Sequence, residues 1–328
     1  MRRPVDLPPP LAQLPAFSVA TAKRHGVSER RLRSRTLVAP FHGVRMPGTA
    51  APLDARAAAA AYASRMPSAQ FFSHATAALL WGAPLPRRIE TSRTLHVAVL
   101  KDRAQPRARG VIGHRLDPAQ VRVVEQHGMR LADPASTWCR LPGLLGFDDL
   151  VAVGDFLVTG AEPSGGPPAV SSLAELERAV DAGRWMNAGL LREALGLVRV
   201  GPLSRPESIN RLRFVRAGLP EPVPNLVVRD DAGREIAMVD HAYPGYRVGV
   251  EYEGEDHLER ARFRRDLHRA ERLADAGWLI VRLSGDDLPV RPPNVETARM
   301  RETVERIAAR LRSRGWVGAV GSSCRAPD

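Results

Sequence analysis

The stretch MVDHAYPGYRVGVEYEGEDH, Met238–His257, decides the fold of the second half of the chain. Pro244 and Gly245 are turn residues between two β-rich runs, which predicts two strands joined by a tight connection. Because successive side chains of a strand alternate between its faces, Glu251 and Glu253 should project to one side of the second strand. The apolar residues that should project to the other side are Val248, Val250 and Tyr252. We therefore expect one packed face and one acidic face.

The acidic residues of this stretch suit a divalent cation. Asp240 ends the first β-rich run, so three carboxylates lie at a strand end and on the next strand. Like-charged carboxylates gathered together are unfavourable unless a proton or a cation neutralises them. Mg²⁺ accepts a few carboxylate oxygens and retains water molecules for chemistry. The segment therefore indicates metal-assisted hydrolysis, and the alternative is an exposed edge strand whose acidic side chains face solvent.

The sequence on either side completes an α/β module. Upstream, Ser204 and Glu207 form a capping-box pattern at the start of a helix that ends at Gly218. Three β-rich runs follow, NLVVRD, REIAMVD and RVGVEYE, and hairpin residues 230–233 join the first two. The module continues with a helix at 259–276, an apolar strand at 278–283 and an amphipathic helix at 294–314. The predicted order is αβββαβα.

This ordered set of residues resembles the DUF559 and very-short-patch-repair-like branch of the PD-(D/E)XK nuclease superfamily. The matching residues include AGLP at 217–220, VD.AYP at 239–244, VEYEG at 250–254 and GW..VRL at 277–283. They cover about Ser204 to Leu288, which is nearly the whole module. The resemblance implies a restriction-endonuclease-like αβββαβ core that uses Mg²⁺ or Mn²⁺.

The resemblance also implies roles for individual residues. Asp240 and Glu251 would bind the metal ion. Glu207, from the first helix, and Glu253 would complete or order its shell. His257 would act as an acid, a base or a phosphate contact.

The chain departs from the superfamily pattern at one position. Its lysines are Lys23 and Lys101, both outside the module, and Glu253 stands where the superfamily has a lysine. A lysine would steady the attacking water and the developing phosphate charge, so that role would fall to His257 or to a second metal ion. The departure leaves open a non-catalytic alternative, in which the fold is retained for binding alone.

The site residues also have structural alternatives. Glu207 could serve only to close the N-terminus of its helix, and Asp240 could be an ordinary turn residue. His257 could only pack against or cap the helix that follows it. Asp266 and Arg269 lie three residues apart on that helix, so we interpret them as a surface ion pair outside the catalytic set.

Residues 17–47, FSVATAKRHGVSERRLRSRTLVAPFHGVRMP, indicate a second function. They predict a helix, a turn at Gly26, a helix capped by Ser28 and a short β-hairpin, which is the order of a winged helix-turn-helix. In such a domain the second helix enters the major groove, where arginines contact phosphates or guanine edges. The candidate DNA-binding residues on this helix are Arg30, Arg31, Arg33 and Arg35. The alternative is an arginine-rich helix that faces solvent.

Residues 26–47 are also similar to the N-terminal domain of AbiEi-type antitoxins, and the region after residue 53 looks like the segment that follows the winged helix in those proteins. This resemblance implies DNA as a partner and a toxin or another protein as a second one. The predicted organisation is a winged helix-turn-helix at 1–52, an α/β connecting domain at 53–160, a linker with helices at 161–200, the nuclease-like domain at 201–315 and a tail at 316–328.

The histidines and cysteines predict no metal site of their own. The histidines of the connecting region are His74, His96, His114 and His127, and their spacings match no compact metal motif. We therefore interpret them as structural. Cys139 and Cys324 are far apart in the sequence, which indicates neither a disulfide framework nor a zinc site.

The composition is that of a globular, strongly basic chain. It has 328 residues and a formal net charge of +12, which suits a polyanionic partner because neutralising phosphates releases counterions. No apolar run reaches membrane-spanning length, and the proline-rich start lacks the hydrophobic region of a signal peptide. The expected location is the cytoplasm, without membrane contact.

Taken together, these patterns predict an α/β multidomain protein in which a winged-helix DNA-binding region is fused to an endonuclease-like domain. The expected activity is Mg²⁺-dependent hydrolysis of phosphodiester bonds in DNA, with RNA as the weaker alternative. The competing hypothesis is a non-catalytic, antitoxin-like transcriptional regulator whose C-terminal domain binds a partner.

Overall fold

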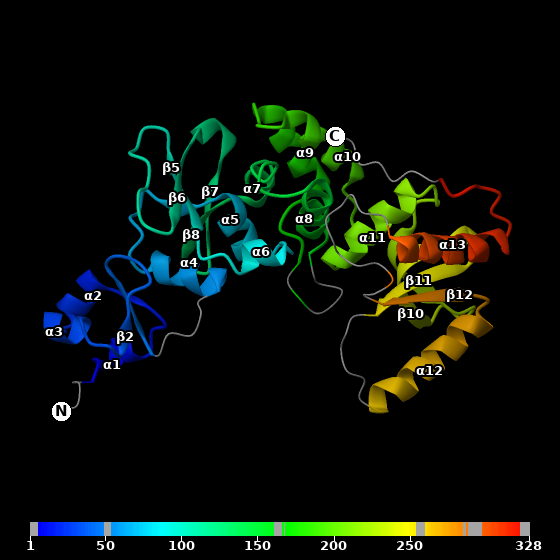
Figure 1. Ribbon diagram of the computed structural model, residues 1–328, viewed down its shortest axis with the longest axis horizontal. Helices are drawn as coiled ribbons and strands as arrows, with labels where there is room; N and C mark the ends of the chain where they lie inside the picture. The colour runs from blue at the N-terminus through cyan, green and yellow to red at the C-terminus, as the bar shows by residue number, and fades with distance from the viewer. Residues whose placement is uncertain are drawn as a thin grey trace. The chain divides into compact units, whose positions relative to one another are not determined.

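The chain is a mixed α/β multidomain protein, as predicted, and its structure is a computed structural model (Figure 1). The structure describes residues 6–48, 54–160, 166, 168–253, 260–284, 287 and 297–321, and their side chains apart from those of 253 and 260–267. It divides into two compact units, Met1–Leu145 with Val170–Glu193 and Gly146–Ala169 with Ala194–Asp328. In the described part of the chain, no helix is both long and apolar enough to cross a membrane.

The first unit begins with a small helical and β region. Its elements are α1 Pro9–Ala12, β1 Phe17–Ser18, α2 Val19–Arg24, α3 Glu29–Leu32, β2 Leu37–Val38 and β3 Val44–Pro47, with an antiparallel sheet of order β1-β3-β2. Ser18 and Ser28 cap α2 and α3 by accepting bonds from the backbone N–H three residues on, and Gly26 between them has a φ of +76°. The Ser28 cap and the turn at Gly26 are where the sequence predicts them, and the Ser18 cap was not predicted.

The second helix of this region is shorter than predicted. Arg30 and Arg31 lie in α3, but Arg33 is already its C-cap and Arg35 lies beyond it. The hydroxyls of Ser34 and Thr36 bond each other, and the Ser34 hydroxyl also accepts from the Thr36 N–H, which offers the chain an alternative to continuing the helix. The four arginines therefore span a helix and the turn after it.

The rest of the first unit is a five-stranded sheet with helices. The elements are α4 Ala55–Ala63, β4 Phe71–Phe72, α5 His74–Trp81, α6 Arg87–Glu90, β5 Leu95–Leu100, β6 Val111–Leu116, η1 Pro118–Gln120, β7 Val123–Gln126, β8 Met129–Ala132, α7 Pro134–Trp138 and α9 Leu173–Ala182. The strand order is β6-β5-β4-β8-β7, with β5 and β6 parallel. Phe41 and Val44 share a core cluster with Tyr62, Phe72 and Leu95. The β2–β3 region therefore packs on this sheet and belongs to the same unit.

The second unit holds the module predicted from Met238–His257. Its elements are α8 Phe147–Thr159, α11 Arg205–Arg216, β9 Val223–Arg229, β10 Glu235–Tyr243, η3 Pro244–Tyr246, β11 Val248–Glu253, α12 Arg260–Asp275, β12 Leu279–Ser284 and α13 Ala298–Arg312, while α10 Ala188–Leu197 runs across the division between the units. From α11 to α13 the order is αβββαβα, as predicted. The sheet order is β12-β11-β10-β9, and β11 and β12 are parallel. Since β11 is an interior strand, the exposed-edge alternative for it was wrong.

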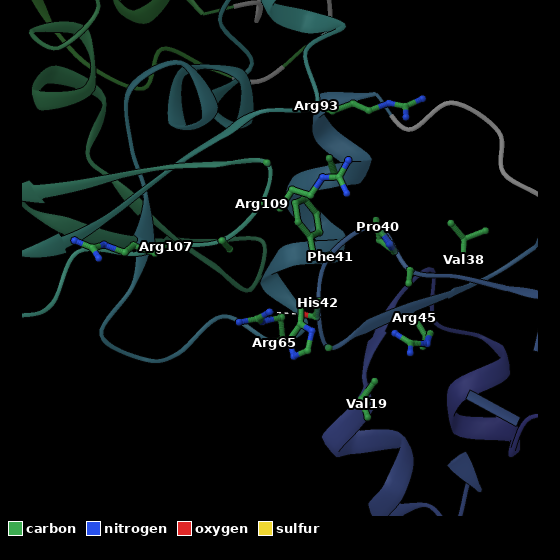
Figure 2. Close-up of a pocket in the computed structure, with 15 residues that line it drawn as sticks. Val19, Val38, Pro40, Phe41, His42, Arg45, Arg65, Arg93, Arg107 and Arg109 are labelled. Atoms are coloured by element: carbon green, nitrogen blue, oxygen red, sulfur yellow. Dashed lines mark hydrogen bonds between the residues drawn. The ribbon is translucent and has the colours of Figure 1, made fainter. Parts of the chain in front are cut away.

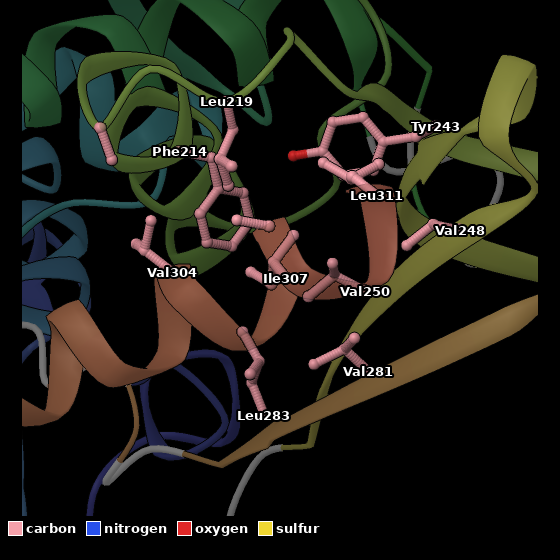
Figure 3. Close-up of a cluster of buried hydrophobic side chains, with 12 residues drawn as sticks. Phe214, Leu219, Tyr243, Val248, Val250, Val281, Leu283, Val304, Ile307 and Leu311 are labelled. Atoms are coloured by element: carbon pink, nitrogen blue, oxygen red, sulfur yellow. The ribbon is translucent and has the colours of Figure 1, made fainter. Parts of the chain in front are cut away.

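The sheet of the second unit is packed on both faces. One cluster joins Phe214 of α11, Val250 of β11 and Ile307 of α13, and Figure 3 shows these side chains converging. The other cluster includes Val239 of β10 and Leu273 of α12. Each fully buried aliphatic side chain of this kind contributes roughly 1.5–3 kcal/mol. Strand β11 is therefore held from both sides, which fixes the register of its acidic residues.

A buried ion pair connects α8 to α11 within the second unit. The carboxylate of Asp155 accepts a bond from the Arg211 guanidinium at 3.2 Å, and both side chains are 1% exposed. Arg211 also bonds Glu221 and the carbonyl of Leu197. Burial raises the pKa of Asp155, and the nearby guanidinium opposes that effect. Helix α8 thus belongs structurally to the second half of the chain.

Candidate functional site

Strand pairing brings two of the predicted metal ligands together. The antiparallel pairing of β10 and β11 ends with His241 opposite Val250, so Asp240 and Glu251 are the residues that adjoin the last pair on each strand. The Asp240 carboxylate accepts a bond of 2.8 Å from the backbone N–H of Tyr252. Glu251 is buried, with 6% of its surface exposed. A turn and a register thus place two carboxylates side by side on an interior part of the sheet.

Glu207 both caps its helix and acts on this site. Its carboxylate accepts bonds from the Ser204 hydroxyl at 2.7 Å and from the backbone N–H of Leu203 at 2.9 Å. Its backbone N–H donates to the Ser204 hydroxyl at 3.4 Å, so the capping interaction predicted from the sequence is present. The side chain of Asn225 donates to the same carboxylate. These bonds hold the negative charge of Glu207 at the end of α11 nearest Asp240.

The surroundings of Asp240 bring it under the influence of the two other carboxylates. The pKa of Asp240 is raised from 3.8 to about 6, chiefly by burial and in addition by the charges of Glu207 and Glu251. The bond from the Tyr252 N–H and the charge of Arg269 act in the opposite direction. A carboxyl group in this state releases its proton readily when a cation arrives. Carboxylate oxygens are the ligands that Mg²⁺ and Mn²⁺ use, although among the described residues these three side chains do not lie close enough together to hold one ion as they stand.

Arg269 belongs to this site, although the sequence indicated a surface ion pair with Asp266. Its guanidinium forms an ion pair with Glu251 and donates to the carbonyl of Met238 at 2.9 Å. The side chain of Glu251 is 8% exposed and that of Arg269 is 35% exposed. Helix α12 thus supplies a cation beside the carboxylates of a module that contains no lysine.

The remaining predicted residues are placed only in part. Glu253 ends β11, where it pairs with Ser284 of β12, and its side chain lies outside the described residues. His257 also lies outside them. A histidine that the sequence analysis did not single out, His241, is buried beside Asp240, and its Nε2 lies 2.9 Å from the Glu207 carbonyl. Burial lowers the pKa of His241, so a neutral imidazole connects β10 to α11.

The arginines predicted to bind DNA differ in their surroundings. Arg31 donates to the Thr36 hydroxyl at 2.7 Å, and Arg33 lies 3.4 Å from Glu29, which also binds Lys23. Arg30 and Arg35 are exposed. This region presents positive charge at the surface, with Glu29 neutralising part of it.

A larger basic feature lies next to this region in the same unit. A cavity of about 1050 Å³ is lined by Arg45, Arg65, Arg93, Arg107 and Arg109, together with His42 and apolar residues such as Phe41 and Val19 (Figure 2). None of its lining residues, all of them in the described part of the chain, is acidic. Arg45 donates to the carbonyl of Leu32 at 2.7 Å, and Arg65 donates to that of His42, so backbone bonds orient two of the guanidiniums. The cavity can accept an anionic group, and phosphate suits planar guanidinium donors.

This cavity could not be predicted from the sequence because its residues come from separate segments. Arg45 is in β3, Arg65 follows α4, Arg93 precedes β5, and Arg107 and Arg109 lie between β5 and β6. No local pattern relates them. The packing of Phe41 against Gly110, where an added Cβ would lie 3.4 Å from the ring, shows how closely the segments approach.

Comparison with known proteins identifies two partial relatives. The uncharacterized proteins MT2308 and Rv2248 of Mycobacterium tuberculosis, from two strains, are each 36% identical to this chain over 104 residues. The match covers 31% of this chain and 38% of each relative, so the chain spans well under half of their length. No family model matches the chain. No solved structure matches it either.

Proposed function

We propose that the chain binds DNA through its first unit and hydrolyses phosphodiester bonds with Mg²⁺ or Mn²⁺ in its second. The observation that carries the catalytic part is Asp240, a largely buried carboxyl group with a pKa of about 6 between the charges of Glu207 and Glu251. Placing buried Glu251 and partly buried Glu207 and Asp240 near one another opposes folding unless they serve a cation or a proton. The arrangement agrees with the resemblance to the DUF559 and very-short-patch-repair-like nucleases, whose core would be formed by α11 to α13.

Each side chain of the candidate metal site would have its own role. Asp240 and Glu251 would hold the ion, and Glu207 would add negative charge behind Asp240 while keeping α11 in place. A bound Mg²⁺ or Mn²⁺ would polarise the phosphate and lower the pKa of a water molecule. Arg269 would leave Glu251 when the ion binds and turn its guanidinium towards the phosphate, which takes the role of the missing lysine. Glu253 and His257 remain candidates for ordering water and transferring a proton.

DNA would be held by the first unit. The region of Arg30 and Arg35 resembles the second helix and following turn of an AbiEi-type winged helix, and the arginine-lined cavity adjoins it in the same unit. Guanidiniums from both features would neutralise backbone phosphates, since such contacts supply most sequence-independent affinity. The expected setting is the cytoplasm, and a toxin-like protein is a second candidate partner.

One observation favours a second function, that of a non-catalytic DNA-binding regulator. Arg269 already neutralises Glu251, and the module contains no lysine. When ion pairs within a site neutralise its charges, the site can persist in a fold that is used only for binding. In that case the second unit would bind a protein partner and would not cleave DNA.

A cleavage assay distinguishes these functions. Purified full-length protein should nick supercoiled plasmid with Mg²⁺ or Mn²⁺ and stop when a chelator is added. Asp240→Asn should abolish nicking and retain DNA affinity, whereas the matched control Asp231→Asn, in the exposed β9–β10 turn, should leave both unchanged. Absence of nicking by the wild-type protein on DNA and RNA with either metal would favour the regulator.

A further inference from the structure

Three histidines of the first unit meet although they are far apart in the sequence. His74 begins α5, His96 lies in β5 and His114 lies in β6. One ligand nitrogen from each lies within 4.8 Å of those from the other two. The rings are nearly parallel, with centroids 3.8 Å apart for His74 and His114 and 5.2 Å apart for His96 and His114.

The sheet itself creates this cluster. In the neighbouring strands β6 and β5 lie His114 and His96, and His74 begins α5, separated by Ser73 from the end of β4, the next strand in the order β6-β5-β4. The Ser73 N–H donates to the His96 carbonyl at 3.0 Å, which fixes the end of β4 against β5. The parallel register of β5 and β6 pairs Ala98 with His114, so His96 and His114 share a face. A search for short sequence motifs of metal ligands does not find ligands that are this far apart in the sequence.

The backbone of His74 is strained in order to join the cluster. Its φ is +48°, in the left-handed region that residues other than glycine rarely adopt. Such strain concentrates at functional sites, where the surrounding structure maintains it. The Nδ1 of His74 lies 2.9 Å from the Ser73 hydroxyl, which occupies that nitrogen and leaves Nε2 for another partner. A hydrogen bond to the other ring nitrogen commonly orients a metal-binding imidazole in this way.

Two of the imidazoles lie within hydrogen-bond distance of each other. Nδ1 of His96 lies 3.0 Å from Nε2 of His114, so one of these nitrogens must carry the proton and the other must accept it. Burial is the main cause of the lowered pKa of all three, which is about 2 for His74 and about 4 for His114, so their rings are neutral at pH 7. Besides the histidines themselves, the described group whose charge acts on His74 and His114 is Arg140, a cation and not a carboxylate.

We propose that His74, His96 and His114 form a binding site for a borderline-soft divalent cation, Zn²⁺ above all, with an open fourth coordination position. Three neutral imidazoles are ligands that Zn²⁺, Co²⁺ and Ni²⁺ prefer over Mg²⁺, and Zn²⁺ sites with three protein ligands take water or an exogenous ligand as the fourth. The ion would take the place of the His96–His114 hydrogen bond.

Arg140 defines what the fourth ligand should be. Its guanidinium is held by the carbonyls of Ser136, at 2.6 Å, and Gln120, at 3.0 Å, and by the ring of Trp185, 4.8 Å from its centroid. A fixed positive charge beside three neutral ligands weakens binding of a bare cation and strengthens binding of a cation that carries an anion. The fourth ligand should therefore be hydroxide, carboxylate or phosphate. The site lies in the first unit, so it is independent of the carboxylates on β10 and β11.

The test is a titration of chelator-treated full-length protein with Co²⁺ and then Zn²⁺. We expect one equivalent of Co²⁺ to give the intense visible absorption of a four-coordinate ion with nitrogen ligands, and Zn²⁺ to displace it. His74→Gln and His114→Gln should each weaken Zn²⁺ binding by more than the roughly 10- to 100-fold typical of removing a group that only hydrogen-bonds a ligand. The matched control His127→Gln, in the exposed β7–β8 turn, should bind as the wild type does.

Two further measurements keep the test decisive. Asp240→Asn with Glu251→Gln should bind Zn²⁺ normally, because those residues belong to the second unit. If the histidine variants do not fold, X-ray absorption of the Zn²⁺-loaded wild-type protein should still show three imidazole ligands. Absence of the Co²⁺ spectrum, a coordination shell without three imidazoles, or unchanged affinity in folded His114→Gln would each overturn the proposal.

Discussion

At the scale of single residues, Asp240 carries a charge that its surroundings make unfavourable. Its pKa is about 6 in the folded chain against an ordinary value of 3.8, so between these pH values the folded state keeps a proton that the unfolded state has released. The stabilising contribution of this residue is therefore fully present below about pH 4 and is lost as the pH rises to about 6. At neutral pH the ionised carboxylate opposes folding until a cation binds.

The first prediction follows from the direction in which Asp240 changes the stability of the fold with pH. Without metal, Asp240→Asn should raise the free energy of unfolding at pH 7 by about 1–3 kcal/mol, because it removes the buried charge and keeps an acceptor for the Tyr252 N–H. The gain should shrink towards pH 4. Denaturant unfolding at several pH values measures it, and Mn²⁺ should raise the melting temperature of the wild type but not of the variant. A decrease in stability at pH 7 would contradict a buried, ionised Asp240.

Arg269 is the second residue with a testable role. If it neutralises Glu251 until a metal ion arrives, Arg269→Gln should increase Mn²⁺ affinity by roughly 10-fold, which corresponds to about 1.4 kcal/mol of relieved repulsion between cations. Phosphodiester cleavage should nevertheless fall, because the guanidinium is needed at the phosphate. Calorimetric titration and plasmid nicking measure the two effects.

The control for Arg269 lies on the same helix. Arg272 is exposed and donates to the Glu235 carbonyl at 3.0 Å, so Arg272→Gln should change neither property. Equal Mn²⁺ affinities in the wild type and Arg269→Gln would show that Arg269 and the metal site are not coupled.

The sequence predicted those candidate site residues whose positions depend on nearby residues of the chain. Asp240 and Glu251 follow from two strands joined by a tight turn, and Glu207 follows from a capping pattern four residues long. Arg269 was assigned to a surface pair because its partner Glu251 is 18 residues away and reached only through the packing of α12 on β10. The three clustered histidines were interpreted as structural because their spacing in the sequence does not indicate the strand order. That strand order brings them together.

At the scale of elements, α3 and the arginine-lined cavity divide the expected DNA contacts. The helix has four residues, which is short for reading a major groove, whereas the cavity offers five guanidiniums from four places in the chain. We therefore expect much of the affinity to come from the cavity. The Ser28 capping residue predicted the start of α3 correctly, but the helix ends at Leu32, before Arg33 and Arg35.

The third prediction compares these arginines. Arg93→Ala with Arg109→Ala should weaken DNA binding by about 10-fold or more for each phosphate left without its guanidinium, and should reduce the slope of log affinity against log salt by about 1 for each such phosphate. Fluorescence anisotropy at several salt concentrations measures both quantities. Arg103→Ala is the matched control, because Arg103 is exposed in the same β5–β6 connection but pairs with Asp102 and does not line the cavity. If Arg103→Ala weakened DNA binding equally, the net charge of the protein, and not the cavity, would determine the DNA affinity.

At the scale of the whole molecule, the chain passes between its two units more than once. Residues up to Leu145 and the segment Val170–Glu193 form one unit, whereas α8 and everything from Ala194 onwards form the other. The sequence indicated consecutive domains with a linker near 160, because composition marks the glycine- and proline-rich stretch but not which core a helix joins. A simple truncation therefore separates α9 from α7, with which it packs in the first unit.

The fourth prediction uses this arrangement. A fragment that joins residues 1–145 to 170–193 through a short glycine-serine linker should fold cooperatively and bind DNA with nearly wild-type affinity. It should not cleave DNA. A fragment ending at residue 160 should melt at a lower temperature, because it lacks α9 and exposes the apolar face of α8. Thermal unfolding followed by circular dichroism compares the two, and DNA binding by neither fragment would contradict the proposed role of the first unit.

The buried pair of Asp155 and Arg211 has a further consequence while the protein is being made. The two residues are 56 positions apart, so at about 5–20 residues per second the ribosome adds Arg211 roughly 3–11 s after Asp155. Throughout that interval α8 has neither its counter-charge nor α11 to pack against, and Leu150, Val151 and Leu157, all buried in the finished fold, stay in contact with water. On the nascent chain, α8 should therefore expose an apolar surface that chaperones can bind until α11 has been made.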